Sequence, residues 1–165
     1  MQEKWAKKLE VDTFTNLFQV SGDFYRSEQP QCSSFDLLCS LGLRSILNLR
    51  SRDNNKAVLA DLPLNNFHVS MLPDKFGDPE ILMALRHLLA APKPILVHCQ
   101  HGSDRTGVVF ALYRIIFENW SKQDAIKEMK EGGFGYHVKY TNIPNYVESA
   151  DIEKMKRQLD SILAE

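Results

Sequence analysis

The sequence has few cysteines, no long apolar run and no excess of charge of either sign. Three cysteines in 165 residues are too few for a scaffold held by disulfides, and their odd number leaves at least one free thiol. No apolar segment approaches the roughly 20 residues of a membrane-spanning helix. Twenty basic and 21 acidic residues give a net charge of −1, which excludes an overall field that attracts nucleic acid or an anionic membrane. We therefore expect a soluble protein without nucleic-acid partners, in which any anion site is local.

Hydrophobic residues make up 44% of the chain, which is enough for one sizeable core. Apolar clusters recur along the whole length, and no internal repeat or linker rich in proline or glycine separates them. We therefore predict a single domain over residues 1–165, in which residues 1–20 form an N-terminal extension.

The apolar pattern predicts strands that alternate with helices. The period of two in residues 66–71 is typical of a strand, and Asp78 followed by Pro79 is typical of a helix start with Asp78 as the N-cap. The expected strands are 43–49, 66–71 and 95–98, and the expected helices begin near Ser33, Asp78, Thr106, Ser121 and Ile152. This order predicts an α/β fold with a central, mostly parallel sheet flanked by helices.

A specific motif follows the strand expected at residues 95–98. It runs from His98 to Thr106 and fits the pattern H-C-x-x-G-x-x-R-[ST], which arises by chance about once in a million windows at ordinary residue usage. A loop of this length can wrap around a tetrahedral oxyanion with its N–H groups inward, and Gly102 lacks a side chain where the backbone turns tightly. The residues expected to hold a phosphate group are Gln100, His101, Gly102, Ser103, Asp104 and Arg105.

Cys99 is the candidate nucleophile of this motif, and Arg105 is the candidate clamp for the anion. The N-terminus of the following helix and the Arg105 guanidinium both stabilise negative charge, so we expect Cys99 to be a thiolate at neutral pH. Arg105 can hold two phosphate oxygens, which aligns the phosphorus with the sulfur. The expected chemistry is hydrolysis of a phosphate monoester through a phosphocysteine, which requires neither a metal ion nor another cofactor.

The leaving oxygen needs a proton, so a second acidic residue should lie across the pocket from the nucleophile. Asp74 and Asp78 are the candidates. Asp78 has a structural role as the predicted N-cap, whereas Asp74 lies in a loop after a strand and has no capping role. The sequence therefore favours Asp74 as the general acid and leaves Asp78 as the alternative.

The motif resembles that of the protein tyrosine phosphatase superfamily, and further segments are similar to small bacterial phosphatases of the dual-specificity type. These segments are Gly22–Pro30, Ile46–Arg50 and Gly132–Gly135, and the likeness covers about residues 20–150. It implies the α/β fold of those enzymes and a substrate that is a phosphorylated protein or a small phosphomonoester. Phosphotyrosine is the expected substrate, with phosphoserine and phosphothreonine as further ones.

The resemblance also implies roles for two residues that flank the loop. Thr106 is expected to donate a hydrogen bond to the sulfur of Cys99, and His98 is expected to order the loop and favour the thiolate. We expect a monomer. The compartment stays open, because the sequence as written is that of a cytoplasmic protein, whereas several bacterial relatives are exported to the periplasm by a signal peptide that is then removed.

Several other interpretations remain open. His98, Cys99 and His101 could ligate zinc, although no second ligand pair has a suitable spacing. Rhodanese-type sulfurtransferases and arsenate reductases have similar cysteine loops, and a phosphate-binding module with weak catalysis would share the motif. An inositol phosphate or phosphoinositide is the alternative substrate, although the carboxylate of Asp104 disfavours it if that carboxylate faces the pocket. His137 is expected to be a surface or packing residue.

Overall fold

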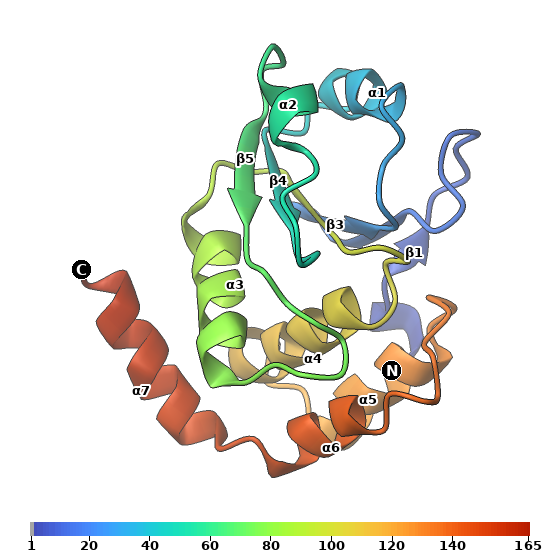
Figure 1. Ribbon diagram of the computed structural model, residues 1–165. Helices are drawn as coiled ribbons and strands as arrows, with labels where there is room; N and C mark the ends of the chain where they lie inside the picture. The colour runs from blue at the N-terminus through green and yellow to red at the C-terminus, as the bar shows by residue number, and fades with distance from the viewer. Residues whose placement is uncertain (1) are drawn as a thin grey trace.

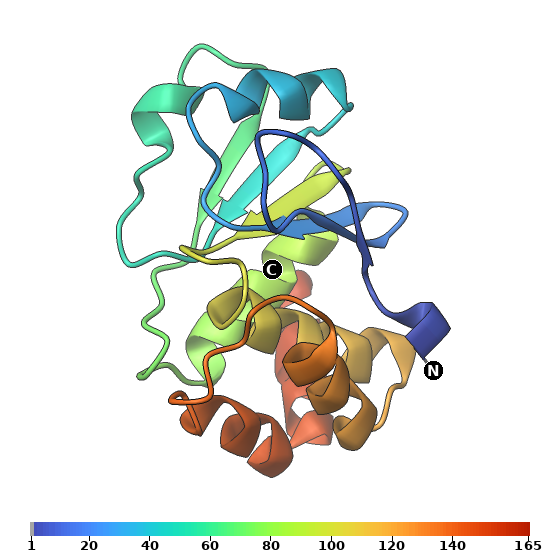
Figure 2. The ribbon, with the colours of Figure 1, turned by 90° about the vertical axis from the view of Figure 1, so that its right-hand side faces the viewer.

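The computed structural model describes residues 2–165, and it contains one sheet with helices on both faces (Figure 1, Figure 2). The order of the six strands is β1-β2-β3-β6-β4-β5. Their bounds are β1 Lys7–Lys8, β2 Phe18–Ser21, β3 Phe24–Ser27, β4 Ser45–Asn48, β5 Asn65–His68 and β6 Ile95–His98. β3, β6, β4 and β5 pair in parallel, whereas β1 and β2 are antiparallel additions at one edge. The predicted α/β fold with a mostly parallel sheet is confirmed.

The helices form two layers of unequal size, as Figure 2 shows. One face of the sheet carries α1 (Ser34–Ser40) and the short α2 (Lys56–Leu59). The other face carries α3 (Asp78–Ala90), α4 (Arg105–Glu118), α5 (Lys122–Glu131), α6 (Asn142–Ser149) and α7 (Ile152–Leu163). A turn of 3-10 helix, Gln2–Lys4, precedes β1.

The hydrophobic core is divided by the sheet because successive side chains of a strand point to opposite faces. On β4, Ile46 packs with the residues of α1 and α2, whereas Leu47 belongs to the larger cluster on the opposite face. On β6, Leu96 and Val97 are divided in the same way, and all four residues of the strand are buried. β6 is thus a central strand covered on both faces, as its apolar sequence predicts.

Part of the segment predicted to be an N-terminal extension lies in the sheet. β1 pairs with β2, and Lys7 lies opposite Gln19. β2 in turn forms an antiparallel hairpin with β3, and Phe18 and Val20 of β2 are buried. The sequence pattern did not predict this hairpin, because strands of two to four residues are too short to give a clear period.

The prediction that Asp78 is the N-cap of its helix is wrong. Gly77 occupies that position in an extended conformation, and its N–H donates to the Glu80 carboxylate at 3.0 Å. Asp78 is the first residue of α3, and its carboxylate instead accepts a hydrogen bond from the Tyr146 hydroxyl. A tertiary contact with α6 therefore replaces the local capping bond.

The strand predicted over residues 66–71 is shorter than its pattern suggests. β5 pairs with β4 as far as His68, because β4 ends at Asn48, and the Val69 N–H makes the last bond to the Asn48 carbonyl at 3.0 Å. Val69 and Met71 stay buried beyond the end of the strand. The alternation thus continues into the segment that leads to Asp74.

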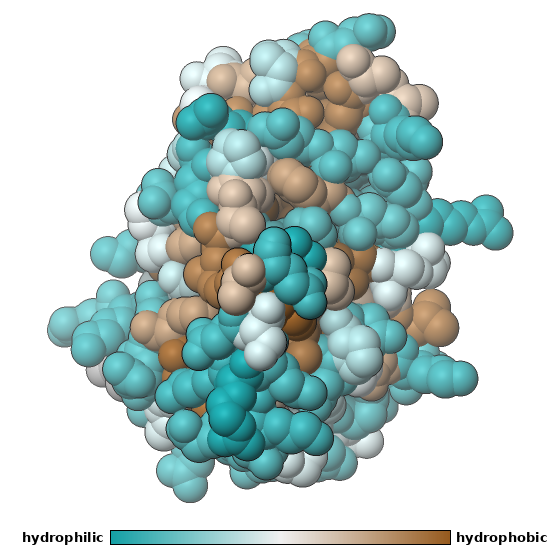
Figure 3. Space-filling model, turned by 90° about the vertical axis from the view of Figure 1, so that its left-hand side faces the viewer, coloured by the Kyte–Doolittle hydropathy of each residue, from teal (hydrophilic) through white to brown (hydrophobic). Residues whose placement is uncertain are grey.

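The surface shown in Figure 3 carries apolar residues in small groups separated by hydrophilic ones. The large apolar side chains with the greatest exposure come from several different elements: Leu41, Leu72, Met83, Phe117, Val138 and Leu163. Scattered apolar side chains of this kind are normal on a folded protein. Within residues 2–165, no helix is both long and apolar enough to cross a membrane.

Candidate active site

The predicted phosphate loop lies between the end of β6 and the start of α4, and it can be followed in Figure 1. Cys99 directly follows β6 and is buried, with 2% of its surface exposed. Gly102 has a φ of +77°, and a Cβ at this position would lie 2.5 Å from the carbonyl carbon of Ser27. The loop can therefore pass this close to the end of β3 only with glycine at position 102.

Four successive carbonyl groups of the loop, those of residues 99–102, are held by donors that lie outside it. Each donor comes from a different residue, and the four bonds are 2.8 to 3.1 Å long. They are His98 Nδ1 to the Cys99 carbonyl, Gln29 N to the Gln100 carbonyl, Asn16 Nδ2 to the His101 carbonyl, and Arg26 Nη2 to the Gly102 carbonyl.

These contacts fix the direction of the N–H groups as well. In a planar trans peptide the carbonyl and the following N–H point in opposite directions, so the N–H groups of residues 100–103 point away from the outer donors. Within residues 2–165, none of these four N–H groups donates to a protein acceptor. A row of free N–H groups on the inner side of a loop can bind an anion, and we call the N–H groups of residues 100–103 the cradle.

Arg105 joins the cradle to the segment that carries the candidate acid. Its Nη1 donates to the Met71 carbonyl at 3.1 Å, while its Nε is buried and has no acceptor among the described residues. Arg105 is the first residue of α4, and the N-terminus of that helix adds further positive potential. Arg105 thus has donor capacity that a bound phosphate group would use.

His98 is held by a chain of side-chain hydrogen bonds that fixes its tautomer. Gln29 Nε2 donates to Asn55 Oδ1 at 3.0 Å, and Asn55 Nδ2 faces His98 Nε2 at 2.7 Å. Nε2 is therefore an acceptor, and Nδ1 carries the proton that it donates to the Cys99 carbonyl. Burial lowers the pKa of His98 to about 4, so the ring is neutral at neutral pH. His98 orders the loop by this hydrogen bond and not by a positive charge.

Asp104 has a partner that the sequence did not indicate. Its carboxylate accepts from the His137 backbone N–H at 2.9 Å and from His137 Nδ1 at 2.6 Å. The His137 ring also packs against the His101 ring, with centroids 5.0 Å apart. His137, expected to be a surface or packing residue, therefore contacts two residues of the loop. The carboxylate of Asp104 is engaged by His137, so the charge argument against an inositol phosphate loses its main support.

The two candidate acids differ in their surroundings. Asp74 is exposed in a turn closed by the Lys75 N–H and the Leu72 carbonyl, and the described residues form no hydrogen bond with its carboxylate. Asp78 is tied to Tyr146, and the pKa of that tyrosine is raised by burial and by this hydrogen bond. The Asp74 carboxylate thus has no partner among residues 2–165, and Asp74 lies three residues beyond Met71, whose carbonyl accepts from Arg105.

The segment of Asp74 is also anchored on its far side. Asn142 of α6 donates from Nδ2 to the Pro73 carbonyl at 2.9 Å. Together with the Arg105 bond to Met71, this contact fixes the backbone directly before Asp74 at two points.

Two hydroxyl groups of the motif are buried without a partner. Neither Ser103 Oγ nor Thr106 Oγ1 makes a hydrogen bond within the described part of the chain, so the expected bond from Thr106 to the Cys99 sulfur is not formed in this structure. Across residues 2–165, no group of three histidine, cysteine, aspartate or glutamate side chains is placed to hold a metal ion.

Comparison with known proteins identifies the family to which this site belongs. The sequence profile of the tyrosine phosphatase family matches residues 12–163. The chain belongs to the tyrosine phosphatase family. It is 36% identical over 154 residues to the dual specificity protein phosphatase TpbA of Pseudomonas aeruginosa, covering 92% of this chain and 69% of the relative.

Solved structures of family members agree with the fold. A crystal structure of a TpbA variant of P. aeruginosa in complex with pTyr has a TM-score of 0.84 and 33% identity, over 95% of this chain and 96% of the other. The catalytic domain of the PP-IP phosphatase SIW14 from Saccharomyces cerevisiae has a TM-score of 0.76 and 26% identity, over 93% and 96%. The motif loop thus lies in a fold that both kinds of phosphatase share.

The structure brings Cys99, Arg105 and the loop residues together and adds an outer group of contacts that the motif does not contain. That group consists of Asn16, Arg26, Gln29, Asn55 and His137. A signal for two of them was present, since Arg26 and Gln29 lie in the Gly22–Pro30 segment that is similar to the dual-specificity enzymes. Nothing in the local sequence distinguishes Asn16 or Asn55.

Proposed function

We propose that the protein hydrolyses phosphate monoesters through a phosphocysteine at Cys99, with protein phosphotyrosine as its main substrate. The observation that carries this proposal is the cradle, in which four free N–H groups follow a buried cysteine and precede an arginine. The N–H groups and Arg105 would bind the three non-bridging oxygens of the phosphate. The TpbA complex with pTyr supports the choice of substrate.

The first step transfers the phosphoryl group to the enzyme. The Cys99 thiolate attacks the phosphorus, the bond from phosphorus to the ester oxygen breaks, and Asp74 gives its proton to that oxygen. Arg105 and the cradle stabilise the charge on the equatorial oxygens. The step releases tyrosine, or another hydroxyl compound, and leaves a phosphocysteine.

The second step returns the enzyme to its starting state. The Asp74 carboxylate takes a proton from a water molecule as its oxygen attacks the phosphorus, and the bond from sulfur to phosphorus breaks. Inorganic phosphate and the thiolate are the products. Thr106, whose hydroxyl has no hydrogen-bond partner within residues 2–165, would donate to the departing sulfur.

An inositol phosphate is the second candidate substrate. The contact of Asp104 with His137 favours it, because the carboxylate that would repel a highly charged ring is directed to His137. The similarity to SIW14, a PP-IP phosphatase, points in the same direction. Phosphotyrosine remains the main proposal because TpbA has the higher identity.

We also propose that the chain acts as a monomer with one domain over residues 1–165. Both hydrophobic clusters pack against the same sheet, which supports a single domain. Every contact of the cradle comes from this one chain, so the site needs no second copy.

The substrate is tested by comparing kcat/KM for a phosphotyrosine peptide, a phosphoserine peptide and an inositol pyrophosphate with the same preparation. We expect the phosphotyrosine peptide to exceed the inositol compound by about tenfold or more, which corresponds to about 1.4 kcal/mol in transition-state binding. The reverse order would establish the second candidate. Protection of Cys99 by phosphate without turnover of any compound would leave only a phosphate-binding module.

A further inference from the structure

The Gly132–Gly135 turn has no part in the proposed reaction, yet its backbone conformation favours glycine at three positions. A Cβ on Gly132 would lie 2.5 Å from both the Glu128 carbonyl oxygen and a carbon of the Phe134 ring, and Gly133 and Gly135 have φ values of +90° and +85°. These glycines allow the chain to turn sharply after α5 and to bury Phe134. The turn therefore serves to place this one aromatic ring.

Phe134 lies against Arg26, which is 2% exposed. The guanidinium carbon lies 3.6 Å from the centroid of the Phe134 ring and 5.6 Å from that of Phe110. Within residues 2–165, no carboxylate lies within ion-pair distance of Arg26. Its side chain donates one hydrogen bond, from Nη2 to the Gly102 carbonyl at 2.9 Å. Burial of an arginine without a carboxylate partner costs free energy of desolvation. We therefore ask what its contact with the loop contributes.

Arg26 keeps its positive charge despite its burial. Burial lowers the pKa of Arg26 to about 10, which still leaves the side chain protonated at neutral pH. Glu128 and Cys99 are the negative groups that favour its charge, and Arg114 opposes it.

Asn16 completes the group. Its Nδ2 donates to the His101 carbonyl at 2.8 Å and to the Phe134 carbonyl at 2.9 Å. Asn16 and Arg26 thus hold two neighbouring peptide groups of the loop from outside, and Phe134 contacts both of them.

We propose that Asn16, Arg26 and Phe134 form an outer clamp that positions the phosphate loop. The clamp pulls the His101 and Gly102 carbonyls outward, which aims the N–H groups of Gly102 and Ser103 at the phosphate. Asn16 and Arg26 bond the carbonyl side of the loop, opposite the N–H groups that would face the phosphate, so the members of the clamp are positioning residues. This proposal rests on the proposed function for the identity of the anion.

The test measures phosphate binding without relying on turnover. Iodoacetate alkylation of Cys99 is followed by mass spectrometry of its peptide, which separates it from the free thiols Cys32 and Cys39, over a range of inorganic phosphate concentrations. The variants are Arg26→Met, Arg26→Lys and Asn16→Ala. Asn16 is only partly buried, so its variant tests the clamp even if an Arg26 variant fails to fold.

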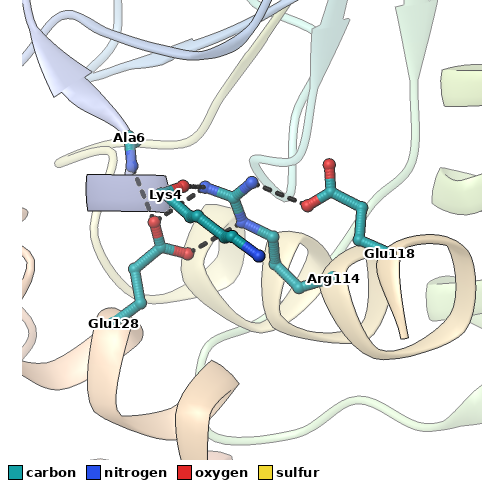
Figure 4. Close-up of polar contacts among 5 residues, drawn as sticks. All are labelled: Lys4, Ala6, Arg114, Glu118 and Glu128. Atoms are coloured by element: carbon teal, nitrogen blue, oxygen red, sulfur yellow. Dashed lines mark hydrogen bonds and ion pairs between the residues drawn. The ribbon is translucent and has the colours of Figure 1, made fainter. Parts of the chain in front are cut away.

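Arg114→Lys is the matched control. Arg114 is also 2% exposed and lies over the Trp120 ring, but it bonds Glu118, Glu128 and the Lys4 carbonyl, away from the loop (Figure 4). Arg26→Lys and Arg114→Lys remove the same planar guanidinium and keep a positive charge.

We expect Arg26→Met and Asn16→Ala to weaken protection by phosphate about tenfold, as the loss of one positioning hydrogen bond implies, and Arg26→Lys to recover part of it. If phosphate protected Arg26→Met and Asn16→Ala as well as it protects the wild type, the proposal would be overturned. A loss of protection in Arg114→Lys equal to that in Arg26→Lys would also overturn it. A wild-type enzyme that is protected by phosphate but hydrolyses no ester would contradict the proposed function and leave the clamp standing.

Discussion

His98 provides a prediction about stability that follows directly from its burial. The folded protein keeps this ring neutral because burial lowers its pKa to about 4, whereas in the unfolded chain the pKa returns to about 6.5. Between these values the unfolded state binds a proton that the folded state does not. The contribution to stability is therefore fully present above pH 6.5 and is lost as the pH falls towards 4.

The size of the effect follows from the two pKa values. At about 1.36 kcal/mol for each pH unit, the interval from 6.5 to about 4 amounts to about 3 kcal/mol in the free energy of unfolding. About 2 kcal/mol of this is lost between pH 7 and pH 5. With a urea slope of about 2 kcal/mol per molar, the midpoint should fall by about 1 M.

The assay compares urea unfolding of the wild type and of His98→Gln at pH 7 and pH 5. Glutamine is neutral at both values and can still donate and accept hydrogen bonds. The stability that protonation of carboxylates elsewhere removes is lost in both proteins and cancels in the comparison. Between pH 7 and pH 5, the free energy of unfolding should therefore fall by about 2 kcal/mol more in the wild type than in the variant. Equal losses would show that His98 is not held neutral in the folded protein and would refute the reasoning.

Two further predictions concern the acid and the loop. Asp74→Asn should slow hydrolysis of esters with poor leaving groups about 100-fold and of activated esters much less, while Asp78→Asn should retain activity because Asp78 bonds Tyr146. Steady-state rates with phenyl and para-nitrophenyl phosphate decide this, and the opposite ranking would assign the acid to Asp78. Gly102→Ala should weaken competitive inhibition by inorganic phosphate about tenfold or more, because its Cβ would meet the Ser27 backbone. Unchanged inhibition would contradict the close approach.

The central features of the site could be predicted because they lie in nine consecutive residues. His98 to Thr106 contains the candidate nucleophile, the arginine and the glycine, and the preceding apolar strand fixes where the loop begins. The chemistry of such a loop depends on local backbone geometry, which the motif specifies. The order of strands and helices was sufficient for the fold class.

The outer contacts could not be predicted, because they depend on which strands are neighbours. β3 pairs with β6 so that Ser27 lies opposite His98, and only this register brings Arg26 and Gln29 beside the loop. The strand order depends on packing across the whole chain and leaves no local pattern.

The N-cap of α3 shows how a local rule fails. Gly77 and Asp78 both suit that position, and in the structure Gly77 occupies it while Asp78 bonds Tyr146, a residue 68 positions away. A local pattern cannot include such a partner. The same limit applies to Asp104, whose partner His137 lies 33 positions further along the chain.

The central claim is that Cys99 is the nucleophile of a phosphatase, and one measurement tests it most directly. Hydrolysis of para-nitrophenyl phosphate is followed from about pH 4 to pH 8 in the presence of a chelator, for the wild type and for Cys99→Ser. We expect turnover by the wild type and none by the variant. Equal rates in the two proteins, or no hydrolysis by either, would contradict it.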